Sequence, residues 1–216
     1  MVAEALNHSI EQPSSGLRHP PTGRFKRPQS SRMKPHPSHP SITDATTPIE
    51  IVPHDDSWPA KFQDERSLLQ ATLAPWLAGP IEHIGSTAVA GLAAKPVIDI
   101  MSAVDSLEAS RPAIAAVAQL GYVYYPYQAD AMHWFCKPSP SFRTHHLHLV
   151  PIASPLWAQR LSFCDALRNS AALAAEYGDL KLQLAHQFPL DREAYTDGKT
   201  AVIRRVLSIA LWTSRM

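Results

Sequence analysis

The sequence predicts an α/β (α+β) fold with a mixed sheet and a helical C-terminal part. Two observations support this class. Short runs rich in β-branched and aromatic residues alternate with helical patterns up to about residue 150, and helical periodicity alone continues from Pro155 to Trp212. The chain has 216 residues, which is enough for one well-filled domain.

The first 48 residues differ in composition from the rest of the chain. They contain eight of the 20 prolines and few large apolar side chains, so they bury too little surface to offset the entropy lost on ordering. We therefore predict a disordered Pro/Ser-rich tail over 1–48 and one folded domain over 49–212. Formal charge is +3 in the tail and −2 in the remainder. A nearly neutral domain argues against dedicated nucleic-acid binding.

Several features of the sequence bear on the cellular compartment of the protein. No apolar run approaches the ~18–20 residues of a membrane span, and the first residues lack the charged start and apolar core of a secretory signal. The two cysteines, Cys136 and Cys164, form no disulfide framework and suit a reducing compartment. We expect a cytoplasmic protein with no membrane partner. Arginines in the tail leave organelle targeting as the alternative.

The domain is predicted to open with an extended segment over 49–53, followed by a helix. Ser57 or Asp56 caps this helix, and Pro59 lies in its first turn. Pro75 and the Gly79-Pro80 pair are expected to end this helix. One helical face carries the large apolar residues Trp58, Phe62, Leu69, Leu73 and Trp76.

Strands are predicted next, at 81–84 and 97–103, and then a helix over 106–120 that ends at Gly121. Turn-like residues separate three further strands at 122–127, 132–137 and 145–150. The helical C-terminal part is expected to break near Asn169–Ser170 and at Pro189.

The segment from residue 83 to 101 reads HIGSTAVAGLAAKPVIDIM. Gly85 allows close approach of a ligand to the backbone, and the hydroxyls of Ser86 and Thr87 can bond phosphate oxygens. Lys95 adds a positive charge. Asp99 then lies in an apolar strand, where a carboxylate is costly unless it is paired or holds a cation. This order suits a nucleoside triphosphate site. An ordinary turn with a locally paired aspartate is the alternative.

A second cluster lies in residues 143–150, RTHHLHLV. Strand alternation places His146 and His148 on one side. Together with Asp99, neutral imidazoles would suit zinc, manganese, iron or nickel better than magnesium. A general base, a protonated partner of phosphate, and packed supporting histidines remain alternatives. Arg143 is either a phosphate contact or a surface arginine.

These segments resemble the GrpB family, whose pattern around the loop reads roughly H-I-G-S-T-A-V-P-G-L-x-x-K-P-x-I-D-I. Residues 83–100 match every fixed position except Ala90, where the family tends to have proline. The opening IEIVPHDDSWPAKFQDE, the segment RTHHLHLV and residues 176–199 are also similar to the family. The resemblance covers about residues 50–210.

The GrpB family is usually placed in the nucleotidyltransferase superfold, so the resemblance implies a nucleotidyltransferase-like mixed sheet with C-terminal helices beside a cleft. Carried over by position, Gly85 and Ser86 contact phosphate, with Thr87 and Lys95 beside them, and Asp99 holds a divalent metal, Mg or a transition metal such as Zn or Mn. The implied ligand is a nucleoside triphosphate or phosphometabolite. The implied reaction transfers a nucleotidyl or phosphoryl group to a hydroxyl. Some members are fused to dephospho-CoA kinase, which suggests coenzyme A metabolism.

One position departs from the superfold's pattern. A second carboxylate is expected two residues after Asp99, and Met101 occupies that position; a thioether has no affinity for magnesium. Two alternatives follow: a non-catalytic nucleotide-binding module, or a transition-metal hydrolase that uses Asp99, His146 and His148.

Two further patterns bear on the site. Gly198-Lys199-Thr200 resembles the end of a P-loop, but Glu193 stands where the loop needs glycine. We interpret Lys199 as an exposed helical lysine, with a place in the site as the alternative. Of the aromatic residues, either Trp134 or Phe135 is expected to face the cleft.

Overall fold

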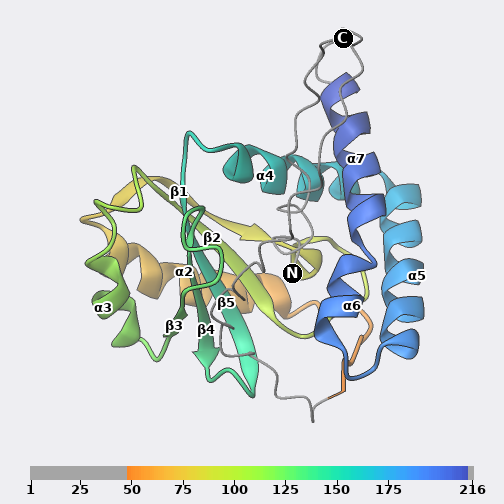
Figure 1. Ribbon diagram of the computed structural model, residues 1–216, viewed down its shortest axis with the longest axis horizontal. Coiled ribbons are helices and arrows are strands. Elements are labelled where there is room, and N and C mark those ends of the chain that lie inside the picture. Colours follow the sequence, from red (N-terminus) through yellow and green to blue (C-terminus); the bar gives the residue numbers. More distant parts are fainter. Residues whose placement is uncertain (1–47, 214–216) are drawn as a thin grey trace, which may run out of the picture.

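The computed structural model describes residues 48–213 and their side chains up to residue 209 (Figure 1). The predicted tail lies outside the described residues, apart from Pro48. One mixed sheet has the order β1-β2-β5-β4-β3. Its strands are β1 (Leu77–Ile84), β2 (Ile98–Val104), β3 (Val123–Tyr125), β4 (His133–Pro138) and β5 (Arg143–Pro151). The helices are α2 (Trp58–Leu73), the 3-10 turn η2 (Ser86–Ala88), α3 (Ala113–Ala118), α4 (Pro155–Arg168), α5 (Ala171–Gln187), α6 (Arg192–Asp197) and α7 (Thr200–Thr213).

The predicted fold class, a mixed α/β sheet with C-terminal helices, is confirmed. Strand β2 lies inside the sheet, antiparallel to β1 and parallel to β5. The parallel register places Asp99 opposite His146 and Met101 opposite His148. Because side chains alternate along a strand, these four residues lie on one face of the sheet.

The two faces of the sheet have different coverings. Helices α2 and α3 pack on the face that carries Ile98, Ile100 and Leu147. The opposite face packs Met101 and Trp157 of α4 into a second core. Helices α5, α6 and α7 stand together at one side of the sheet (Figure 1). Helices α5 and α7 form a third cluster with α4, and Tyr195 of α6 packs with Leu184 of α5 in a fourth. The face with Asp99 is therefore walled by the C-terminal helices.

Two sequence predictions were wrong at element boundaries. Helix α2 ends at Leu73, before Pro75, but strand β1 begins at Leu77 and runs through Gly79-Pro80, where a break before a strand at residue 81 is predicted. An edge strand tolerates proline, because its outer side needs no ladder N–H. The helix predicted over 106–120 is only α3, Ala113–Ala118. The hydroxyls of Ser106 and Ser110 bond nearby backbone groups and compete with helical hydrogen bonds. In residues 48–213 no helix has the length and apolar character to cross a membrane.

Candidate functional site

The site is built around the turn that follows β1. Gly85 has φ 74° and ψ −169°, a region that essentially only glycine occupies. A Cβ added there would lie 2.5 Å from Oδ2 of Asp99. Glycine therefore allows the turn to pass directly against the Asp99 carboxylate.

Asp99, His146 and His148 converge as one buried group. Nδ1 of His146 lies 2.9 Å from Oδ1 of Asp99, and Nε2 of His148 lies 3.9 Å from the same oxygen. One ligand atom from each residue lies within 4.8 Å of the other two. Among the described side chains, this is the one group of at least three His, Cys, Asp or Glu residues spaced to hold a metal ion. Two imidazoles and a carboxylate form a ligand set found in catalytic zinc sites.

The protonation states suit a metal as well. Burial raises the pKa of the Asp99 carboxyl, yet the hydrogen bond with Nδ1 of His146 contributes to holding this pKa well below its usual value. Burial lowers the pKa of His146 and that of His148, so both rings are neutral, the form that ligates. Within the described part of the chain, nothing hydrogen-bonds Nε2 of His146 or Nε2 of His148. A metal ion would satisfy such buried nitrogens, so these residues fit one.

Met101, at the position expected for a second carboxylate, is fully buried and lies opposite His148. The side of the site where the superfold's second acid would lie is therefore apolar. The ligand set is richer in nitrogen than magnesium prefers.

A small cavity of about 10 Å³ lies in front of Asp99 and is lined by Ser86, Thr87 and Lys95. The Thr87 hydroxyl also donates to the backbone oxygen of Val97 at 3.2 Å and bonds the ring of His83 at 3.0 Å. It therefore holds the turn against β2 as well as lining the cavity.

A larger cavity of about 170 Å³ adjoins the small one and shares Lys95 with it. It is lined by His146, Trp134 and Arg143, whose guanidinium lies 5.4 Å from the centroid of the Trp134 ring. Trp134 rather than Phe135 faces this cavity, since Phe135 is fully buried in the core under α2. Asp99 therefore lines the small cavity and His146 lines the larger one.

Two lysines complete the small cavity, and sequence reasoning did not place them there. Lys181 of α5 and Lys199, between α6 and α7, are 2% and 1% exposed. The interpretation of Lys199 as an exposed lysine was wrong. Lys181 could have been found from periodicity, because Tyr177, Lys181 and Leu184 share one helical face, and both neighbours are buried.

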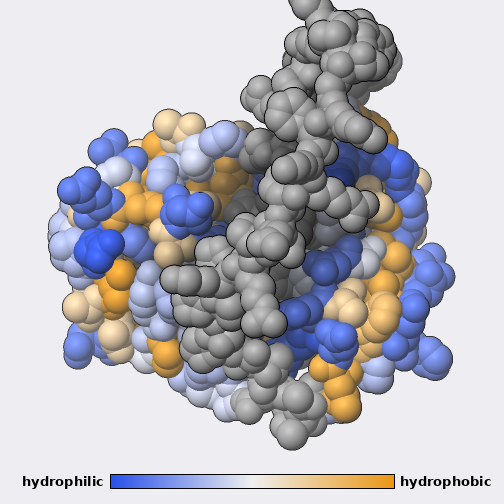
Figure 2. Space-filling model, viewed as in Figure 1, coloured by the Kyte–Doolittle hydropathy of each residue, from blue (hydrophilic) through white to orange (hydrophobic). Residues whose placement is uncertain are grey.

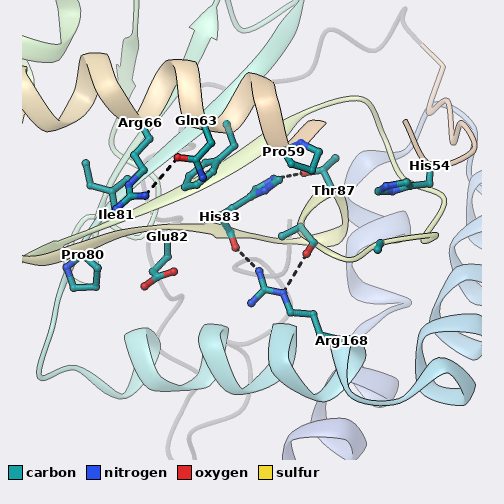
Figure 3. Close-up of a pocket in the computed structure, with 13 residues that line it drawn as sticks. His54, Pro59, Gln63, Arg66, Pro80, Ile81, Glu82, His83, Thr87 and Arg168 are labelled. Atoms are coloured by element: carbon teal, nitrogen blue, oxygen red, sulfur yellow. Dashed lines mark hydrogen bonds between the residues drawn. The ribbon is translucent and has the colours of Figure 1, made fainter. Parts of the chain in front are cut away.

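A third cavity, of about 390 Å³, lies on the other side of the turn, between α2, β1 and the end of α4 (Figure 3). His83 stacks on Phe62 with ring centroids 4.7 Å apart. Arg168 donates to the backbone oxygens of His83 and Ala88. Burial lowers the pKa of His83 to about 4. This cavity contains Thr87 but none of the candidate metal ligands.

The fold and site define a small α/β protein in which a glycine turn, a buried carboxylate and two histidines meet beside lysines. The chain belongs to the GrpB family: the family model described as GrpB protein matches residues 48–208.

Known proteins agree with this assignment. The chain is 41% identical over 173 residues to a UPF0157 protein of Pseudomonas aeruginosa, covering 77% of this chain and 69% of the relative. It is 31% identical over 165 residues to the glutamate-rich protein GrpB of Alkalihalophilus pseudofirmus, covering 74% and 94%. The crystal structure of the conserved protein GrpB from Enterococcus faecalis superposes with a TM-score of 0.70 at 30% identity, covering 77% of this chain and all of that one.

Proposed function

We propose that this protein binds a divalent transition metal at Asp99, His146 and His148 and acts on a phosphorylated small molecule at that site. The observation that carries the proposal is the convergence of these three buried side chains on one point, beside a cavity lined by lysines. A bound metal of this kind polarises a phosphoryl oxygen or lowers the pKa of a bound water.

The residues of the chain have separate roles in this proposal. Asp99 and the two histidines hold the ion. Ser86 and Lys95 line the small cavity and bind phosphate oxygens. Trp134 and Arg143 line the adjoining cavity and contact the remainder of the ligand, a nucleotide or a phosphometabolite.

The reaction we propose is nucleotidyl or phosphoryl transfer to a hydroxyl, as the nucleotidyltransferase-like resemblance implies. Met101 favours a second candidate, phosphoester hydrolysis with a transition metal, because the two-magnesium arrangement needs a second carboxylate there. A binding module without transfer chemistry is the outcome if neither reaction is observed.

One relative points to a class of phosphometabolite. The chain is 38% identical over 81 residues to a dephospho-CoA kinase of Mycolicibacterium paratuberculosis, covering 36% of this chain and 20% of that protein. This likeness supports the testing of coenzyme A precursors beside the common nucleotides.

The metal proposal is tested by elemental analysis and metal titration of the full chain. We expect about one equivalent of zinc, manganese, iron or nickel, and a loss of affinity of about 100-fold or more in Asp99→Asn. Asp105→Asn is the matched control, because Asp105 is exposed just after β2 and makes the same chemical change away from the site. Equal metal binding by both variants would overturn the proposal.

The ligand proposal is tested separately, by thermal-shift titration with ATP, GTP, CTP, UTP and dephospho-CoA in the presence of the metal. A ligand at 100 times its Kd stabilises a protein by about 2.7 kcal/mol. We expect one of these compounds to stabilise the wild type but not Asp99→Asn. Turnover of that compound with and without an acceptor hydroxyl then separates transfer from hydrolysis.

A further inference from the structure

We propose that Arg192 binds a second acidic group of the ligand, a carboxylate or a phosphate, while the phosphoryl group of the same ligand lies at the candidate metal site. The inference rests on the proposed function, because it adds a binding residue and a ligand class to that site. The ligand class is a phosphorylated compound that carries two acidic groups separated by a short linker.

Arg192 reaches the site from the C-terminal helices. It is the first residue of α6 and lines the cavity of about 170 Å³ that His146 of β5 also lines. On the face shown in Figure 2, hydrophilic residues lie along the boundary between the sheet and these helices. The Asp191 side chain accepts a hydrogen bond from the backbone N–H of Ala194 at 2.9 Å, which caps α6. The carboxylate next to Arg192 in the sequence is therefore engaged at the start of the helix.

The guanidinium of Arg192 has unused hydrogen-bonding capacity. Its Nε is buried and has no hydrogen-bond partner, and no ion pair joins Arg192 to a carboxylate of residues 48–209. A buried donor without a partner is costly. A carboxylate or a phosphate offers the paired oxygens that match a guanidinium. An acidic group of a ligand in this cavity would therefore satisfy Arg192.

Arg143 lines the same cavity, but its guanidinium is engaged by the protein. Its Nε donates to the backbone oxygen of Pro140 at 2.8 Å, and the guanidinium lies 5.4 Å from the centroid of the Trp134 ring. These contacts orient Arg143 along the wall that Trp134 forms. Of the two arginines, Arg192 is therefore the one whose Nε is available to a ligand.

The size and the walls of the cavity favour a short, apolar linker. The ring centroid of Trp134 lies 5.1 Å from that of His146, and Val97 and Phe142 add apolar surface. A cavity of about 150 Å³ accommodates benzene, so about 170 Å³ holds a few carbon atoms together with one acidic group. The base and sugar of a nucleotide would extend beyond this space. The cavity therefore matches a linker and its second acid rather than a whole nucleoside.

The test is calorimetric titration of the full chain, loaded with zinc, with non-hydrolysable phosphonates. The probes are phosphonocarboxylates and diphosphonates with linkers of increasing length, and alkylphosphonates of the same lengths are the controls without a second acid. We expect at least one probe to bind about tenfold or more tightly than its alkyl counterpart, because hydrogen bonds between charged groups are strong. The probe series with the larger gain identifies the second acid as a carboxylate or a phosphate.

Arg192→Met should remove this gain and leave the affinities for alkylphosphonates and for zinc equal to those of the wild type. A merely structural role for Arg192 would lower these affinities together with the stability in urea. If Arg192→Met does not fold, Arg192→Lys is the second variant. It keeps the charge but not the paired N–H geometry, so it should also lose most of the gain. Arg66→Met is the matched control, because Arg66 is an exposed residue of α2 outside this cavity, and it should retain the full gain.

The outcomes separate this inference from the proposed function. Absence of a gain, or a gain that persists in Arg192→Met, overturns the inference; zinc and alkylphosphonate binding that depends on Asp99 would leave the proposed function standing. If zinc does not bind, the same titrations use the metal-free chain. A gain there that depends on Arg192 supports the second-acid site and overturns the metal proposal. A gain that depends on both Arg192 and Asp99 supports both.

Discussion

Two cavities flank the turn over Ser86–Ala88. The larger one contains none of the candidate metal ligands, whereas the smaller one contains Asp99. The larger, of about 390 Å³, lies between α2 and β1 (Figure 3). Its polar groups nearest the turn bond one another: His83 to Thr87, and Arg168 to backbone oxygens of the turn region. The smaller, of about 10 Å³, gathers three lysines around Asp99.

The comparison teaches that the chemistry of the lining residues, rather than the volume of a cavity, marks the candidate site. In the larger cavity, the polar groups nearest the turn are hydrogen-bonded within the protein, and these bonds support the turn. The smaller one is lined by Asp99, a candidate metal ligand, together with Lys95, Lys181 and Lys199. We call the side of the turn that faces the larger cavity its structural side, and the side that faces Asp99 its chemical side. The following variants separate the two roles.

Gly85→Ala should cause the largest loss of stability among these variants. It places a methyl group on the chemical side of the turn, against Asp99. Backbone strain costs about 1–3 kcal/mol, and the contact with Asp99 adds an overpacking cost of about 1–3 kcal/mol, so we expect about 4 kcal/mol of lost stability together with weaker metal binding. The measurements are urea unfolding and metal titration.

Gly91→Ala is the matched control for that variant. Gly91 has φ 75°, but a Cβ there would meet no atom within 4 Å. Strain alone should cost about 1–2 kcal/mol, with metal binding unchanged. Equal losses in the two alanine variants would show that the approach of the turn to Asp99 is unimportant.

Because His83 is buried on the structural side of the turn, we expect the stability of the protein to fall at acid pH. Burial lowers the pKa of His83 to about 4 in the folded protein, against about 6.5 for an ordinary histidine, so the unfolded chain binds the extra proton between these pH values. Stability should therefore fall as the pH drops from 6.5 to 4, by about 3 kcal/mol from this residue, since one pKa unit is about 1.4 kcal/mol.

The check is urea unfolding across that pH range, with His83→Gln as the non-titrating comparison. The slope for the wild type should exceed that for the variant by up to about 1.4 kcal/mol per pH unit. Parallel slopes would mean that His83 is not the group that titrates. Other buried histidines remain in both proteins and cancel in the difference.

Thr87→Val should have the smallest effect, because it removes a hydroxyl and preserves shape. The hydroxyl bonds both His83 and the backbone of Val97, and a buried polar partner left unsatisfied costs about 1–3 kcal/mol. We expect a loss of about 1–2 kcal/mol with metal affinity close to that of the wild type. Thr87→Ser should restore most of the stability. A large loss of metal affinity in Thr87→Val would contradict the structural role assigned to this hydroxyl.

Local patterns predicted much of the fold. Apolar spacing and Pro59 located α2, and β-branched runs located the strands. They failed at Gly79-Pro80 and over 106–120, where the edge position of β1 and competing serine hydrogen bonds decided the outcome. Such factors depend on neighbours that a local window does not contain.

By itself, the sequence determined that Asp99 is a carboxylate in an apolar strand and that His146 and His148 share one face of another, because a strand has a side-chain period of two. Only the tertiary structure decided that these strands are parallel neighbours with Asp99 opposite His146, and that Lys181 and Lys199 are buried beside them. The register of a sheet and the docking of helices follow from the packing of the whole core, so no local pattern carries them.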